Sequence, residues 1–389
     1  MPQKYHIKNF DFILLLLLLA VTIIGILAIG SAKESVQTRQ IGGAILGIFL
    51  MAVIACVDYH LILKLQWLIY GLNLGLLLLV QLVGDSSHNA QRWLEIAGIR
   101  FQPSETAKIL LILFYAQFII KHKDNLNTFS TLAKMILLLL PPLALIYKQP
   151  DMSTSIVVAI IFCVILYVGG LSYKIILGLL AVAIPIGVIF LFIVLQPDQT
   201  LIEDYQQERI YAWLNPEKYS LTTAYQQQNS ITAIGSGQLW GKGLNNNEVG
   251  SVKNGNYISE PQTDFIFAII GEEMGFVGSC AVILLLMGIT ARCYLGAMRA
   301  DDIAGAVICS GVGSIVCFQS FINISVTTGI LPNTGIPLPF VSYGLTSLVS
   351  MYIGMGFVFN VQLQRGNRRR TSSEKEDDTG FTLRQNLSR

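Results

Sequence analysis

Long apolar runs separated by short polar segments are the most regular feature of this chain. A run of about 20 apolar residues is long enough to cross the hydrocarbon core of a bilayer as a helix. Such windows predict ten spans, at about 11–31, 41–57, 65–83, 104–120, 131–147, 152–169, 173–195, 264–290, 303–328 and 339–362. We therefore expect an all-α polytopic integral membrane protein, with one long extracytoplasmic loop, 196–263, between spans seven and eight.

The composition agrees with this fold class. The 389 residues are 53% hydrophobic and 13% charged, whereas a soluble domain is about 25% charged. The net charge is only +2, and no nucleic-acid-binding motif is present, so nucleic acid is not expected as a partner. The six cysteines lie in or beside apolar segments without metal-ligand spacing, which is typical of small buried residues.

Basic residues indicate how the spans are oriented. Lysine and arginine are enriched in cytoplasmic loops of membrane proteins. They concentrate in alternate connecting segments, at Lys4, Lys8, Lys64, Lys121, Lys123, Lys174, Arg292, Arg299, Arg365 and Arg368–Arg370. The other connections hold fewer, at Lys33, Arg39, Arg92, Arg100 and Lys148. This bias predicts that both termini are cytoplasmic and that residues 367–389, which turn from basic to acidic, form a disordered tail beyond a membrane domain 1–366.

Unusual polar residues gather where the even-numbered spans begin. The four segments are Gln102–Glu105, Gln149–Asp151, Thr263–Asp264 and Pro337–Gly344. With the amino terminus inside, all four helix starts face the outer surface. Helix amino termini carry unpaired N–H groups and the positive end of the helix dipole, so together they favour an anionic ligand such as a phosphate.

Each of these motifs also has a purely structural interpretation. Glu105 and Asp151 suit the start of a helix as caps, and bare capping is an alternative for Asp264 as well. Lys108 lies one turn inside its span on the face of Glu105, so the two could form an ion pair that only locks the helix. The adjacent Glu272–Glu273 pair lies about 12 Å along the helix from Asp264, which favours structural pairing over catalysis.

In combination these motifs resemble the SEDS family (shape, elongation, division and sporulation), the polytopic peptidoglycan polymerases that include RodA and FtsW. The matching stretches are Asn89–Leu94, Phe101–Lys108, Gln149–Asp151, Ala233–Gly237, Gly241–Gly243, Thr263–Gly275 and Asn323–Ser347. The variants at 91–93 and 241–243 look more like RodA than FtsW. The chain departs from the family pattern at Gln262, where a histidine is usual, and at Leu345, where a glycine is usual.

The resemblance implies a glycosyltransferase that polymerises lipid II in the bacterial cytoplasmic membrane, with lipid II and the nascent glycan strand as its partners. Asp264 matches the family's catalytic aspartate and is expected to be the general base. A class B penicillin-binding protein is the implied partner. The alternatives are a flippase for the lipid-linked precursor, or a non-enzymatic scaffold for a penicillin-binding protein.

The same reaction releases undecaprenyl pyrophosphate, which needs cationic groups around it. Arg92 and Lys108 are the expected pyrophosphate ligands, with Arg209 in the outer loop as a further candidate, and Glu105 is expected to orient Lys108. Asp151 and Ser342 are expected to complete the cavity or to hold a divalent cation, Mg²⁺ or Mn²⁺. No spacing of metal ligands in the sequence demonstrates such a cation site.

Overall fold

The computed structural model describes residues 5–87, 90–96, 99–196, 199, 201–245, 251, 255 and 257–366. The predicted tail, 367–389, lies outside these residues. The described helices are η1 (Ile7–Asn9), α1 (Phe12–Ala32), α2 (Glu34–Ala55), α3 (Tyr59–Lys64), α4 (Gln66–Val83), α5 (Pro103–Lys121), η2 (Lys123–Asn125), α6 (Phe129–Lys148), α7 (Met152–Val168), α8 (Tyr173–Val194), α9 (Asp204–Leu214), α10 (Tyr225–Ser236), α11 (Ile266–Met298), α12 (Ile303–Thr327) and α13 (Leu345–Gln364).

The all-α membrane fold is confirmed. Nine of the described helices are long and apolar enough to cross a membrane, and α7 is a shorter apolar helix in the position of predicted span six. Three boundaries differ from the prediction by more than five residues. Helix α2 begins at Glu34, before the predicted start of span two at residue 41. The last span begins only at Leu345, because the proline-containing stretch before it stays irregular, and α11 extends to Met298.

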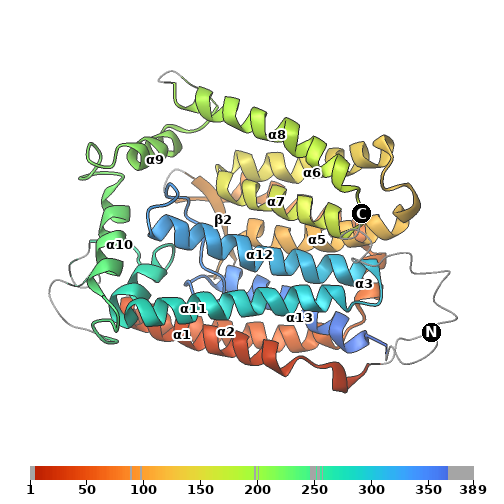
Figure 1. The fold of residues 1–389 in the computed structure, drawn as a ribbon, viewed down its shortest axis with the longest axis horizontal. Helices are drawn as coiled ribbons and strands as arrows, with labels where there is room; N and C mark the ends of the chain where they lie inside the picture. The colour runs from red at the N-terminus through yellow and green to blue at the C-terminus, as the bar shows by residue number, and fades with distance from the viewer. Residues whose placement is uncertain are drawn as a thin grey trace.

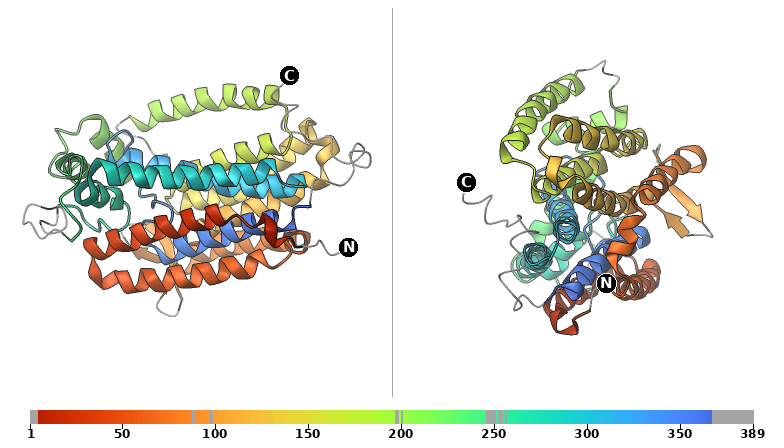
Figure 2. Two further views of the ribbon diagram at one scale, coloured as in Figure 1. Left: turned by 60° about the horizontal axis from the view of Figure 1, so that its bottom comes forward. Right: turned by 90° about the vertical axis from the view of Figure 1, so that its right-hand side faces the viewer.

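Three central helices form the core of the bundle. The spans in α5, α12 and α13 are each 78% buried, whereas in α8 only Val194, at its end, is buried. Figures 1 and 2 show the consequence: α12 and α5 run through the middle of the molecule, and α8 lies along its edge. A helix that is apolar on every side and unburied by protein is suited to lipid on most of its surface.

The two ends of the bundle differ in what they carry. At one end, helices α9 and α10 of the long loop cover the helix starts (Figure 1), together with a small antiparallel sheet of order β1–β2–β3. Its strands are β1 (Asp85–Ser87), β2 (Ala90–Ile96) and β3 (Ile99–Phe101). At the opposite end the two described termini meet, where the His6 amide donates to the Leu363 carbonyl at 2.8 Å. We call these the site end and the terminal end.

Candidate active site

Asp264 lies in the turn that leads into α11, and side chains that donate to the main-chain carbonyls of this turn hold it in place. The buried amide of Asn323 on α12 donates both to the Asp264 carbonyl, at 2.8 Å, and to the Ile336 carbonyl, at 2.7 Å. The Ser342 hydroxyl donates to the Thr263 carbonyl at 2.6 Å and accepts from a loop amide at 2.7 Å. These bonds join the Asp264 turn to the loop before α13.

The Asp264 carboxylate faces the guanidinium of Arg209 across Gly335. An ideal Cβ on Gly335 would lie 3.4 Å from Asp264 Oδ2 and 3.9 Å from Arg209 Nη1. Gly335 also has φ of 71°, a backbone conformation that other residues adopt only with strain. Within the described part of the chain, the Asp264 carboxylate makes neither an ion pair nor a side-chain hydrogen bond. It is therefore available to an external ligand.

Opposing effects set the protonation of Asp264. Burial raises the pKa of this carboxyl above its ordinary value, and the nearby Glu260 and Asp151 act in the same direction. The positive charges of Arg209 and Arg92 lower the pKa and so oppose the shift. Burial lowers the pKa of Arg209, and the charge of Asp264 counteracts this effect. A carboxylate whose pKa is raised while cations lie close by is typical of a group that accepts a proton during a reaction.

Arg92 connects three elements around this site. From β2 it donates through Nε to the Gln149 carbonyl at 3.0 Å, and through Nη2 to the Pro150 carbonyl and to the Tyr205 hydroxyl. Tyr205 lies on α9, where its ring also packs against Arg209, 5.6 Å from ring centroid to Cζ. Arg92 thus holds the start of α7 and α9 together and contributes positive charge to the Asp264 region.

Asp151 and Ser342 have clear structural partners. Asp151 caps α7 by accepting from the Thr154 amide at 3.1 Å, which was one of its two interpretations from sequence, and Ser342 holds the Asp264 turn. The described residues contain no group of three His, Cys, Asp or Glu side chains placed to hold a metal ion. The expected Mg²⁺ or Mn²⁺ therefore stays a prediction, and no step below depends on a cation.

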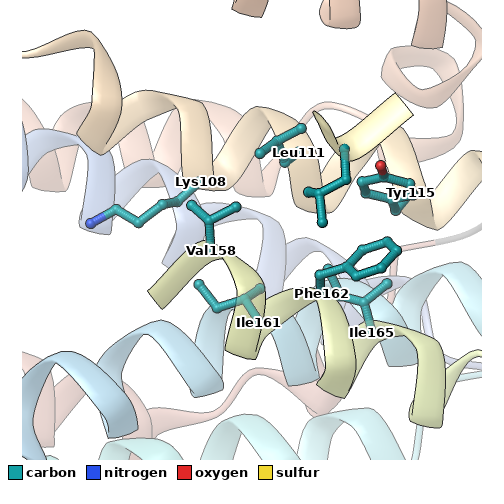
Figure 3. Close-up of a pocket in the computed structure, with 8 residues that line it drawn as sticks. Lys108, Leu111, Tyr115, Val158, Ile161, Phe162 and Ile165 are labelled. Carbon is teal, nitrogen blue, oxygen red and sulfur yellow. The ribbon is translucent and has the colours of Figure 1, made fainter. Parts of the chain in front are cut away.

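Lys108 and Glu105 form a buried ion pair of 2.7 Å, with side chains only 1% and 3% exposed. The Ser347 hydroxyl of α13 donates to the same carboxylate at 2.9 Å. The lysine stem runs along an apolar cavity of about 10 Å³, and its nitrogen points away from Leu111 and Tyr115 (Figure 3). No hydrogen bond or ion pair of the described residues joins this pair to Asp264, so the pyrophosphate role of Lys108 stays a prediction.

The two glutamates of α11 have structural partners, as their distance from Asp264 favours. Glu272 pairs with Lys242 at 2.8 Å, and Glu273 accepts a hydrogen bond from Ser31 on α1. The helix kinks at Gly275, where a Cβ would lie 2.3 Å from the backbone nitrogen of Gly241. These contacts fix the segment after α10 against α11.

Sequence reasoning missed two residues that shape the site. Asn323 is 1% exposed within an apolar span, and a buried amide in such a run is itself a signal of a specific hydrogen-bonding role. Gly335 lies between two prolines in the loop before α13, and a glycine there signals a turn or a close approach. Neither signal alone indicates which partner the residue contacts.

Comparison with known protein families identifies the family that this chain matches. The family of cell cycle proteins FtsW, RodA and SpoVE matches residues 6–367. The chain belongs to this family. Peptidoglycan glycosyltransferase MrdB of Escherichia coli K12 is 35% identical over 367 residues, covering 93% of this chain and 95% of that protein. Probable peptidoglycan glycosyltransferase FtsW of Geobacter metallireducens is 31% identical over 375 residues, covering 92% and 95%.

Solved structures have the same fold. A chain of a complex described as a peptidoglycan synthase complex that coordinates polymerization and crosslinking superposes with a TM-score of 0.76 at 27% identity, over 91% of this chain and 97% of that one. The rod shape determining protein RodA of Thermus thermophilus superposes with a TM-score of 0.68 at 26% identity, over 92% and 98%. These comparisons support the glycosyltransferase interpretation and lend nothing to the flippase alternative.

Proposed function

We propose that this chain is a peptidoglycan glycosyltransferase that polymerises lipid II, with Asp264 as the general base. The environment of the Asp264 carboxylate is the observation that supports its assignment as the base. It has no ion pair within the described residues, its pKa is raised by burial, and Arg209 faces it across Gly335. A general base needs to be free to accept a proton from the substrate, with a pKa raised toward the working pH.

In the reaction, Asp264 takes the proton from the acceptor sugar hydroxyl. The hydroxyl oxygen then forms the new bond to the anomeric carbon of the donor, and the bond from that carbon to the lipid pyrophosphate breaks. The pyrophosphate leaves with the bonding electron pair. Arg209 and Arg92, which already influence the charge of Asp264, are the cations that we place against the leaving group.

The setting follows from the same proposal. The chain is a multi-pass membrane protein, and we place it in the bacterial cytoplasmic membrane with both termini inside and Asp264 at the outer face. The structural likeness to a chain of a peptidoglycan synthase complex supports a class B penicillin-binding protein as partner. That partner would crosslink the glycan strands that this chain makes. Holding the partner would then be a second role of this chain, in addition to catalysis.

The test is the Asp264→Asn variant in purified form with labelled lipid II. We expect it to fold and insert normally and to lose about 100- to 10,000-fold in polymerisation rate, the usual contribution of a general base. Glu260→Gln is the matched control, because Glu260 is an exposed carboxylate that influences the same site, and it should remain active. Undiminished polymer formation by Asp264→Asn would remove this residue from its role.

A further inference from the structure

A second cavity lies at the terminal end, far along the bundle from Asp264. Its volume is about 310 Å³, within the range of about 300–1,000 Å³ that is typical of small-ligand sites. Its walls come from η1, the first turn of α1, and the last turns of α11 and α13. The proposed glycosyl transfer at the other end of the bundle does not use this cavity.

The cavity is strongly cationic. Lys8, Arg292, Arg299 and Arg365 line it, and Asp11 is the one carboxylate among its described lining residues. Arg292 binds that carboxylate at 2.7 Å, whereas the other three cations form no ion pair with any described residue. Helix α1 begins here whereas α11 and α13 end here, so dipole ends of both signs face the cavity and the charged side chains set its potential. These features favour an anionic ligand.

One wall of the same cavity is apolar and faces outward. Phe12 and Ile13, in the first turn of α1, are 69% and 58% exposed and line the cavity beside the charged groups. A soluble anion such as free phosphate gains nothing from such a wall. A phospholipid does, because its acyl chains can lie along α1 while its phosphate reaches the arginines.

A buried amide indicates the chemistry of the headgroup. Gln362 on α13 lines the cavity and is 7% exposed, and its Oε1 atom has no hydrogen-bond partner among the described residues. Its Nε2 atom points toward Asp11 Oδ2, at 3.5 Å. The Oε1 atom is shielded from solvent and needs a donor, and the hydroxyl of a glycerol headgroup supplies one when the Gln362 side chain turns toward the cavity.

We propose that this cavity is a binding site for an anionic phospholipid with a glycerol headgroup. Its phosphate contacts Arg299 and Arg365, and its headgroup hydroxyl donates to Gln362. The general bias of basic residues toward the cytoplasm explains why arginines lie at this end. It explains neither their convergence on one cavity nor the unpaired buried amide.

The experiment uses the full-length protein in nanodiscs, with bound lipid counted by native mass spectrometry. Phosphatidylglycerol should bind in preference to phosphatidylcholine. Each of Arg299→Gln and Arg365→Gln should weaken that binding about fivefold. Lys64→Gln with Lys121→Gln is the matched control, because both lysines are exposed at the predicted cytoplasmic side and neither lines the cavity. This control should bind phosphatidylglycerol as the wild type does.

Three results would overturn the proposal. Equal losses in the control pair would mean that surface charge alone attracts the lipid. Competition by inorganic phosphate as effective as by phosphatidylglycerol would mean a site for free anions. Binding of phosphatidylcholine as tight as that of phosphatidylglycerol would mean that the cavity does not select an anionic lipid. For the headgroup, Gln362→Leu should weaken phosphatidylglycerol binding but not phosphatidic acid binding, and an equal effect on both would refute the glycerol contact.

Discussion

Replacing Asn323 with alanine should disable the site without touching the substrate. The Asn323 amide donates to two carbonyls, of Asp264 and Ile336, and alanine leaves both without this donor. An unpaired buried carbonyl costs about 1–3 kcal/mol, so the two together cost about 2–6 kcal/mol. The bond to the Asp264 carbonyl is only partly buried, so water can replace the lost donor there and bring the cost toward the lower figure. The strain falls on the turn that carries Asp264, so this turn should shift.

A shift of about 1 Å in a catalytic group commonly costs about 100-fold in rate. We therefore expect Asn323→Ala to polymerise labelled lipid II at least about 100-fold more slowly and to unfold at a lower temperature in detergent. Asn73→Ala is the matched control, since Asn73 is also 1% exposed but neither atom of its amide has a partner among the described residues. A fully active Asn323→Ala variant, or equal loss in Asn73→Ala, would refute this reasoning.

Three other changes test separate contacts. Because Asp264 must be ionised to accept a proton and its pKa is raised, the initial rate should fall as pH drops through a value above the ordinary carboxyl range. Arg209→Gln removes a positive charge that lowers the pKa of Asp264, so the pH at which the rate falls should rise. An unchanged pH would contradict the interaction between Arg209 and Asp264. Lys108→Met leaves Glu105 buried and unpaired, so it should cost about 3–5 kcal/mol of stability, which the double variant Glu105→Gln/Lys108→Met should largely restore. Gly275→Ala should destabilise the loop after α10, seen as faster proteolysis there, because its Cβ would clash with backbone and its φ is 65°.

The helices and the convergence of their starts could be predicted from the sequence because both depend on local patterns. Apolar length gives the spans, and a separation of three residues correctly paired Glu105 with Lys108. Capping chemistry also placed Asp151 at the start of α7. In each case the interacting groups lie within one turn of helix, so the sequence contains the geometry.

The remaining contacts of the site could not be predicted because they join distant segments through main-chain atoms. Arg92 binds the carbonyls of Gln149 and Pro150, and every residue has a carbonyl, so no residue type identifies these acceptors in advance. The partner of Glu272 could not be predicted either, because Lys242 reaches it only where the outer loop folds back onto α11. The small β-sheet depends on pairing between short strands with no apolar alternation to reveal them.

The main-chain support of the Asp264 turn has a consequence for which substitutions the family can tolerate. Gln262 stands where the family resemblance leads us to expect histidine, and its main-chain carbonyl accepts from the Tyr343 amide at 2.8 Å. A replacement that fits the buried space around Gln262, which is 3% exposed, leaves this bond in place, whereas loss of the donors Asn323 and Ser342 removes their bonds outright. Sequence variation around the proposed general base Asp264 should therefore be wider among the accepting residues than among the side-chain donors, and a Gln262→His exchange, which keeps the accepting carbonyl, should leave polymerisation intact.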